Sequence, residues 1–79
     1  MLTTVPIDSA AALGTLIRQT RTAAKLRQAD AAVLCGVSVP FLNQIERGKA
    51  TAQFDRVLKV CKGLGIRLFA DAPAQSDAL

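Results

Sequence analysis

The sequence predicts a mainly α-helical fold, in which four helices form one small domain and a short strand follows near the C-terminus. Of the 79 residues, 51% are apolar, yet only three are aromatic, and all three are Phe. A core built from Leu, Ile, Val and Ala is therefore expected, and most apolar residues recur at helical spacing. A chain of this length buries a small core and is only marginally stable alone, which favours dimerisation.

The first helix is expected after a flexible arm formed by residues 1–8. Either Asp8 or Ser9 can cap this helix, which runs to about Ala24. Gly14 weakens the helix slightly but permits close packing of another backbone. The face expected to be buried repeats at helical spacing and comprises Leu13, Leu16, Ile17, Thr20 and Ala24.

The next two helices are short and are joined by a tight turn. The second is predicted over about 28–34, and it lacks a good cap because Arg27 stands where Ser or Thr would serve, at a cost of about 1 kcal/mol. The third is predicted over 39–47, with Ser38 as its cap. Pro40 falls in its first turn, where the missing N–H breaks no intrahelical bond.

Five residues in these two helices share the spacing of a helix-turn-helix motif. A small residue is needed where the helices nearly touch, a glycine in the turn, and apolar residues where the second helix packs on the first. The five are Ala32, Gly36, Val37, Leu42 and Ile45. Motifs of this kind insert their second helix into the major groove of DNA, so residues 39–47 are the expected recognition helix.

A fourth helix is predicted over about 52–63, with Thr51 as its cap. Its apolar face comprises Phe54, Val57, Leu58, Cys61 and Leu64.

Residues 66–71 then have the pattern of a short strand, which cannot be stable without a partner. The expected partner is the same segment of a second copy, in an antiparallel ribbon made by Ile66, Arg67, Leu68, Phe69 and Ala70. The alternative is an extended segment packed on the fourth helix. The domain thus covers residues 9–71, and residues 72–79 are expected to form a disordered tail.

Charge is concentrated in the middle of the chain. The formal net charge is +4, but all ten Lys and Arg lie between Arg18 and Arg67, together with only three acids, so this segment carries +7. Such a basic segment favours a nucleic-acid partner over an ordinary solvated surface. No stretch resembles a membrane span or a signal peptide, which predicts a cytoplasmic protein without a membrane partner.

The residue types argue against catalysis and metal binding. The chain has no His, and Cys35 and Cys61 lack the spacing of a metal or redox motif. Both cysteines fall on apolar helix faces and are expected to be buried thiols. Without paired acids or a glycine-rich phosphate loop, we expect no enzyme activity, no cofactor and no small-molecule ligand.

Two stretches of the chain resemble a known family. LGTLIRQTRTAAKLRQADAA and GVSVPFLNQIERGK are similar to lambda-repressor-like, or Xre-type, helix-turn-helix domains. The continuation GKATAQFDRVLKVCKGLGIRLFAD resembles HipB-like antitoxins, in which a C-terminal strand replaces the fifth helix of the phage repressors. The chain departs from the pattern at Arg27, at Ala50 (usually Pro) and at Ala31, where a larger apolar residue is usual. The smaller contact at Ala31 can be filled by Phe41 or Phe54.

The resemblance implies which side chains would meet DNA. Residues expected to contact bases are Ser38, Val39, Pro40, Asn43 and Gln44, and those expected to contact phosphates are Gln28, Arg27, Arg47 and Lys49. Asn and Gln amides can pair with adenine, and Val39 and Pro40 can touch thymine methyl groups, so an A·T-leaning half-site is the hypothesis. The alternative for Asn43 and Gln44 is an ordinary polar helix face.

Two further pairs have different expected roles. By position, Arg21 and Glu46 resemble the family's internal ion pair, which joins the first helix to the end of the third. Val33 and Leu34 should lie on the outer side of the second helix, either as a patch for a partner protein or as scattered surface apolar residues.

The expected function is that of a homodimeric, sequence-specific repressor acting on double-stranded DNA at a palindromic operator. The resemblance extends this to the HipB-like antitoxin of a toxin-antitoxin module, which would repress its own operon and bind a HipA-like kinase toxin. Two alternatives remain open: a protein-binding module that acts mainly by kinase inhibition, and a solitary or prophage regulator without a toxin.

Overall fold

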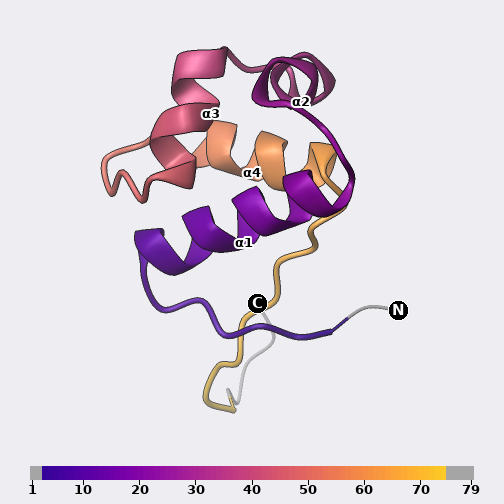
Figure 1. Ribbon diagram of the computed structural model, residues 1–79. Helices are drawn as coiled ribbons and strands as arrows, with labels where there is room; N and C mark the ends of the chain where they lie inside the picture. The colour runs from indigo at the N-terminus through magenta and orange to yellow at the C-terminus, as the bar shows by residue number, and fades with distance from the viewer. Residues whose placement is uncertain (1–2, 75–79) are drawn as a thin grey trace.

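The computed structural model describes residues 3–74 and contains four helices in this range. They are α1 (Ala10–Ala23), α2 (Gln28–Cys35), α3 (Val39–Glu46) and α4 (Phe54–Gly63). α1 and α4 form the lower layer in Figure 1, while α2 and α3 meet above them at a steep angle. This arrangement confirms the mainly α-helical, helix-turn-helix fold. Within the described range, no helix has the length and apolarity needed to span a membrane.

The helices α1, α2 and α3 start where the sequence predicts, and serine side chains cap α1 and α3. The Ser9 hydroxyl accepts a hydrogen bond from the backbone N–H of Ala12 at 3.0 Å, and Ser38 accepts one from Phe41 at 3.1 Å. Ser9, rather than Asp8, is therefore the cap of α1. Arg27 makes no side-chain cap, as its residue type predicts. The ends of these three helices lie within one residue of the predicted positions.

α1 and α2 end in the same way, with a residue of positive φ and two crossing hydrogen bonds. At the end of α2, Gly36 has φ 72°, and the N–H groups of Gly36 and Val37 donate to the carbonyls of Val33 and Ala32. This is the Schellman arrangement, which glycine adopts at little cost. At the end of α1, Lys25 occupies the equivalent position with φ 60°, although it carries a Cβ.

The core lies between the four helices, where α3 packs on α1 and α2 packs on both α3 and α4. Its fully buried side chains include Ile17, Leu42, Val60 and Cys61. Gly14 allows α1 to approach the end of α3, because a Cβ at this position would collide with the carbonyl oxygen of Ile45. Both cysteines are free and buried, as predicted. Ala24, in contrast, is exposed at the end of α1 rather than buried.

The start and the apolar face of α4 differ from the prediction. Thr51 lies in a turn and does not cap the helix, which starts at Phe54 after Gln53 without a side-chain cap. Phe54 is 67% exposed, and Leu58 is also exposed, whereas Val60 is fully buried. Phe41 packs against the core, so it alone of the two candidate aromatic residues can compensate for the small Ala31. Helical spacing fixes which residues share a face, but the packing of neighbouring helices decides where the buried sector ends.

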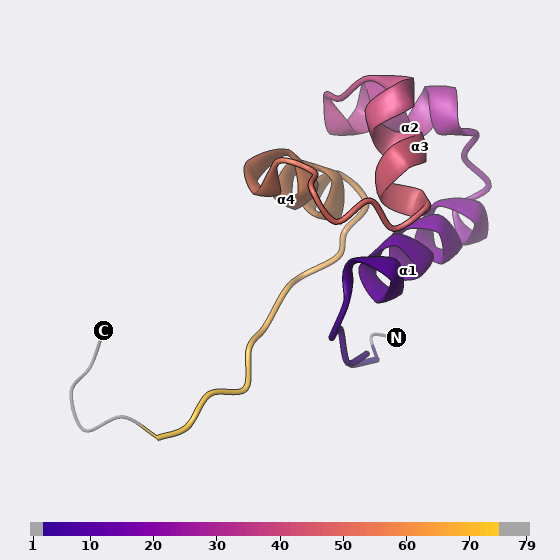
Figure 2. The ribbon, with the colours of Figure 1, turned by 90° about the vertical axis from the view of Figure 1, so that its left-hand side faces the viewer.

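The segment after α4 is extended and leaves the helical body (Figure 2). It forms no β-ladder within residues 3–74, and pairing with a second copy stays a prediction. Ile66 packs against the core, while Phe69 is 78% exposed with the Arg67 guanidinium 5.2 Å from its ring centre. The part of the predicted tail beyond residue 74 and the first two residues of the predicted arm lie outside the described residues.

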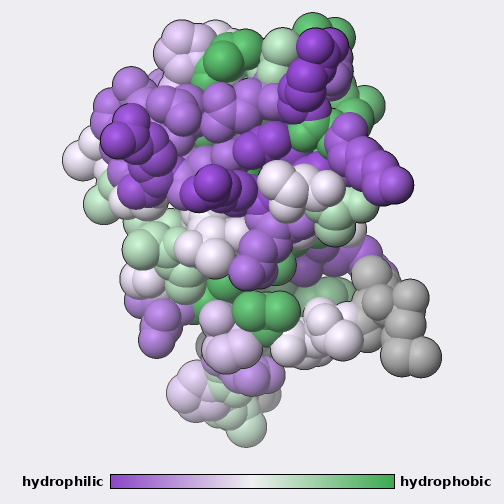
Figure 3. All heavy atoms as spheres, in the orientation of Figure 1, coloured by the Kyte–Doolittle hydropathy of each residue, from purple (hydrophilic) through white to green (hydrophobic). Residues whose placement is uncertain are grey.

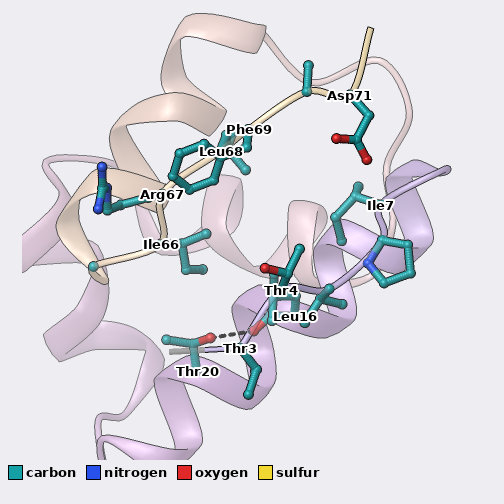
Figure 4. Close-up of a pocket in the computed structure, with 14 residues that line it drawn as sticks. Thr3, Thr4, Ile7, Leu16, Thr20, Ile66, Arg67, Leu68, Phe69 and Asp71 are labelled. Atoms are coloured by element: carbon teal, nitrogen blue, oxygen red, sulfur yellow. Dashed lines mark hydrogen bonds between the residues drawn. The ribbon is translucent and has the colours of Figure 1, made fainter. Parts of the chain in front are cut away.

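A groove of about 810 Å³ separates this segment from the N-terminal arm and α1. Figure 4 shows Ile66, Leu68 and Phe69 on one side, with Thr3, Ile7 and Leu16 on the other. The two ends of the described chain thus line one groove, in which apolar and polar side chains are mixed.

Candidate nucleic-acid interface

α3 presents one side to the core and the other to solvent. Leu42 and Ile45 are buried, which fixes the rotation of the helix about its axis. The predicted base-contacting residues Ser38, Val39, Pro40 and Gln44 are exposed, and Asn43 is half-buried. In the space-filling view, hydrophilic side chains gather over the face that carries α3, and an apolar patch lies near α2 (Figure 3). The exposed side of α3 therefore combines the polar groups of Ser38 and Gln44 with the apolar side chains of Val39 and Pro40, and base edges offer contacts to both kinds of group.

An ion pair anchors the end of α3 to α1. The Arg21 guanidinium donates to both oxygens of Glu46, with Nε–Oε2 at 2.6 Å and Nη2–Oε1 at 2.9 Å. Arg21 also donates to the carbonyl of Leu26 at 2.8 Å, which ties in the segment before α2. Both side chains are largely buried, so the pair excludes water and holds three segments in one geometry.

The environment keeps Glu46 ionised. Burial alone would raise the pKa of the Glu46 carboxyl, but hydrogen bonds from Arg21 and Gln28 and the nearby charges of Arg21 and Arg18 outweigh it. The pKa of Glu46 therefore lies below its ordinary value. The hydrogen bond to Glu46 likewise raises the pKa of Arg21. Glu46 is thus a pure hydrogen-bond acceptor at neutral pH.

Gln28 links the two helices of the motif through its side-chain amide. Its Nε2 donates to Oε1 of Glu46 at 3.1 Å and to Oδ1 of Asn43 at 3.3 Å. The side chain predicted to contact phosphate therefore also bridges to a residue predicted to read bases. These three residues line a small polar hollow of about 230 Å³, together with Arg18, Arg21 and Arg47.

The remaining predicted phosphate contacts lie at the two ends of the motif. Arg47 and Lys49 follow α3 and are exposed, and the Lys49 ammonium donates to Oε1 of Gln44 at 3.1 Å. Arg27 precedes α2 and pairs with Asp30 at 3.1 Å on the surface. Hydrogen bonding to Arg27 lowers the pKa of Asp30. Because this pair is exposed, it restrains Arg27 only weakly.

Arg18 was not among the predicted site residues. It lines the hollow beside Gln28 and Asn43, and its charge contributes to the lowered pKa of Glu46. The signal in the sequence was its position one turn before Arg21, on the same side of α1.

The outer surface of α2 carries the predicted apolar pair. Val33 is 84% and Leu34 is 58% exposed.

Among residues 3–74, no group of His, Cys, Asp or Glu is arranged to hold a metal ion. Burial raises the pKa of both Cys35 and Cys61, which leaves these thiols protonated and unreactive at neutral pH.

Comparison with known proteins finds similarity to a family, to a curated protein and to a solved structure. The model of a helix-turn-helix domain family matches residues 12–68. The HTH-type transcriptional regulator y4mF of Sinorhizobium fredii is 38% identical over 69 residues, covering 87% of this chain and 91% of that protein. A solved complex of a HipB variant with an O2 20mer has a TM-score of 0.79 at 18% identity, covering 90% of this chain and 100% of the other. At that level of identity, the structural likeness shows a shared fold.

Proposed function

This chain belongs to the helix-turn-helix domain family of DNA-binding transcriptional regulators, and we propose that it is a homodimeric repressor of a palindromic operator. The family is not a class of enzymes. The observation that carries the proposal is the fixed orientation of α3. Leu42 and Ile45 are buried, the side with the predicted base contacts is largely turned to solvent, and Arg47 and Lys49 follow the helix at the surface. A major groove accepts such a helix, and the flanking cations suit its phosphates.

Dimerisation through residues 66–71 is the second part of the proposal. The exposed Phe69 and Leu68 and the groove beside them provide an apolar surface that a second copy can cover. Pairing of the two segments about a two-fold axis would satisfy their backbone groups and present α3 twice. A palindromic operator follows from that symmetry.

We further propose that the chain is a HipB-like antitoxin, which represses its own operon and binds a HipA-like kinase toxin. The likeness of fold to HipB supports this assignment. The exposed Val33 and Leu34 on α2 support a protein partner, and they also favour the second candidate function, a module that acts mainly by inhibiting a kinase.

Copurification with the product of the neighbouring gene, followed by footprinting of the shared promoter, tests these functions together. An antitoxin predicts a stable complex with a kinase-like protein and a symmetric protected site. Protection without such a neighbour supports a solitary regulator. A complex without protection supports the kinase-inhibiting module and contradicts the repressor.

A further inference from the structure

The amide groups of Asn43 and Gln44 on α3 are held in a defined orientation by residues outside the proposed base-reading surface. For Asn43, the orientation is set by a relay that starts at Arg21, whose guanidinium can only donate hydrogen bonds. It engages both oxygens of Glu46, which is therefore an ionised acceptor. The Gln28 atom that lies 3.1 Å from Glu46 must consequently be its amino nitrogen, Nε2.

The next step of the relay fixes Asn43. The same Nε2 of Gln28 lies 3.3 Å from the Asn43 side chain, and an amino group needs an acceptor there. The carbonyl oxygen Oδ1 of Asn43 therefore faces Gln28. Since the two polar atoms of a planar amide diverge, the amino group of Asn43 points away from this contact. Rotation of the amide would set two amino groups against each other in a half-buried place and lose the bond.

Gln44 is oriented independently. The Lys49 ammonium has donors and no acceptor, and it lies 3.1 Å from Oε1 of Gln44. The oxygen of this amide is thus also engaged within the protein. In the described part of the chain, no hydrogen bond uses the amino nitrogen of Asn43 or of Gln44.

We infer that α3 presents amide amino groups to DNA and favours guanine, which offers two adjacent acceptors in O6 and N7, over adenine, which offers N7 alone. Paired hydrogen bonds with adenine require the amide oxygen to face N6 of the base, and here the oxygens of Asn43 and Gln44 face donors within the protein. The A·T-leaning half-site expected from the residue types assumed free amides. Asn43 and Gln44 are the residues that set this specificity, while Gln28 and Lys49 act as positioning residues. The inference rests on the proposed DNA-binding function.

Selection of randomised duplexes by the purified full-length protein tests the inference, with wild type compared to Asn43→Asp. The aspartate keeps the oxygen that faces Gln28 but replaces the outward amino group by an acceptor. Wild type should select guanine at one or more pairs of each half-site. The variant should lose that preference by about tenfold at one of these pairs and favour cytosine, whose N4 amino group donates.

The controls separate specificity from charge and folding. Gln53→Glu introduces the same charge before α4, outside the recognition helix, and should leave base preference unchanged. Lys49→Met removes the donor that holds the oxygen of Gln44. The frequency of adenine among selected sequences should then rise at the base pair that Gln44 contacts, whereas Lys62→Met on α4 should leave it unchanged. Thermal unfolding confirms that each variant is folded.

Each result decides the matter. Selection of adenine by the wild type, or an unchanged base preference in folded Asn43→Asp, would overturn the donor-only reading and leave the repressor proposal intact. Failure of the wild type to enrich any sequence would overturn the proposed function, and this inference with it.

Discussion

Gly14 shows how a single hydrogen atom in place of a side chain can set the distance between two helices. Its backbone lies against the end of α3, and the atoms that a methyl group would meet are the backbone carbonyls of Ile45 and Glu46. Backbone cannot rotate out of the way as a side chain can. The position of the ion pair at the end of α3 depends on this approach.

The substitution Gly14→Ala should therefore destabilise the fold, even though alanine is the better helix former by about 1 kcal/mol. We expect the free energy of unfolding to fall by more than about 2 kcal/mol. Overpacking typically costs ~1–3 kcal/mol, and the cost is at the upper end when backbone must move. Urea denaturation measures the effect, and Ala11→Gly at an exposed position of α1 is the control for propensity. Equal or greater stability of Gly14→Ala would contradict the close approach.

Lys25 gives the opposite case, because its side chain makes the local backbone less favourable. It occupies the left-handed position of a Schellman end, where a Cβ costs about 1 kcal/mol or more. Lys25→Gly should raise the free energy of unfolding by roughly 0.5–1 kcal/mol, since the φ of 60° suits glycine. Thermal melting checks the direction. The neighbouring change Ala24→Gly, at a residue with ordinary φ, should destabilise instead.

At the scale of helices, the Arg21–Glu46 ion pair fixes the position of the end of α3 against α1. Removing Glu46 alone leaves a largely buried guanidinium without its partner, which should cost about 3–5 kcal/mol. A double-mutant cycle with Arg21→Met and Glu46→Leu should show strong coupling. Additive effects of the two changes would contradict the role assigned to the pair.

The same pair predicts how stability depends on pH. The pKa of Glu46 is lowered in the folded state, so its contribution is present above the unfolded pKa of about 4.3 and is lost as the pH falls through the folded value. Denaturation curves measured between pH 7 and acidic pH should show this loss in the wild type. Glu46→Gln should be less stable at neutral pH and less sensitive to acid, whereas Asp30→Asn, in an exposed pair, should resemble the wild type.

The helices also show what could be predicted from the sequence and what could not. Ser38 and Gly36 act on backbone within a few residues, so local rules correctly predicted the cap of α3 and the turn before it, although the cap predicted at Thr51 is wrong. Phe54 follows the helical spacing but remains exposed, because burial depends on which helix lies opposite, and that is set by distant contacts. The relay from Glu46 through Gln28 to Asn43 joins residues 15 and 18 positions apart, and no local pattern encodes it.

For the whole molecule, the long-range electrostatic field should govern DNA binding. Neutralising phosphates releases counterions, so affinity should fall steeply with salt. Arg47→Gln should reduce the slope of log affinity against log salt by about one per bound protomer. Lys62→Gln, which removes the same charge from α4, should leave the slope unchanged. A wild-type affinity that does not vary with salt would contradict the phosphate contacts.

Self-association is the other property of the whole molecule. Phe69→Asp places a charge on the exposed end of the groove and should dissociate the proposed dimer, as sedimentation velocity would show. Leu34→Asp makes the same change on α2 and should leave the dimer intact. If the wild type sediments as a monomer at all concentrations, residues 66–71 have another role.

The two cysteines make the opening of this protein measurable without any added label. Cys35 on α2 lies beside the carbonyl of Val60, with Sγ 3.6 Å from the oxygen, and Cys61 is the next residue of α4 after Val60. An alkylating reagent can reach either sulfur only after α2 separates from α4. The rate of carbamidomethylation in native buffer therefore reports how often α2 separates from α4, and a ligand that stabilises the closed form should lower this rate.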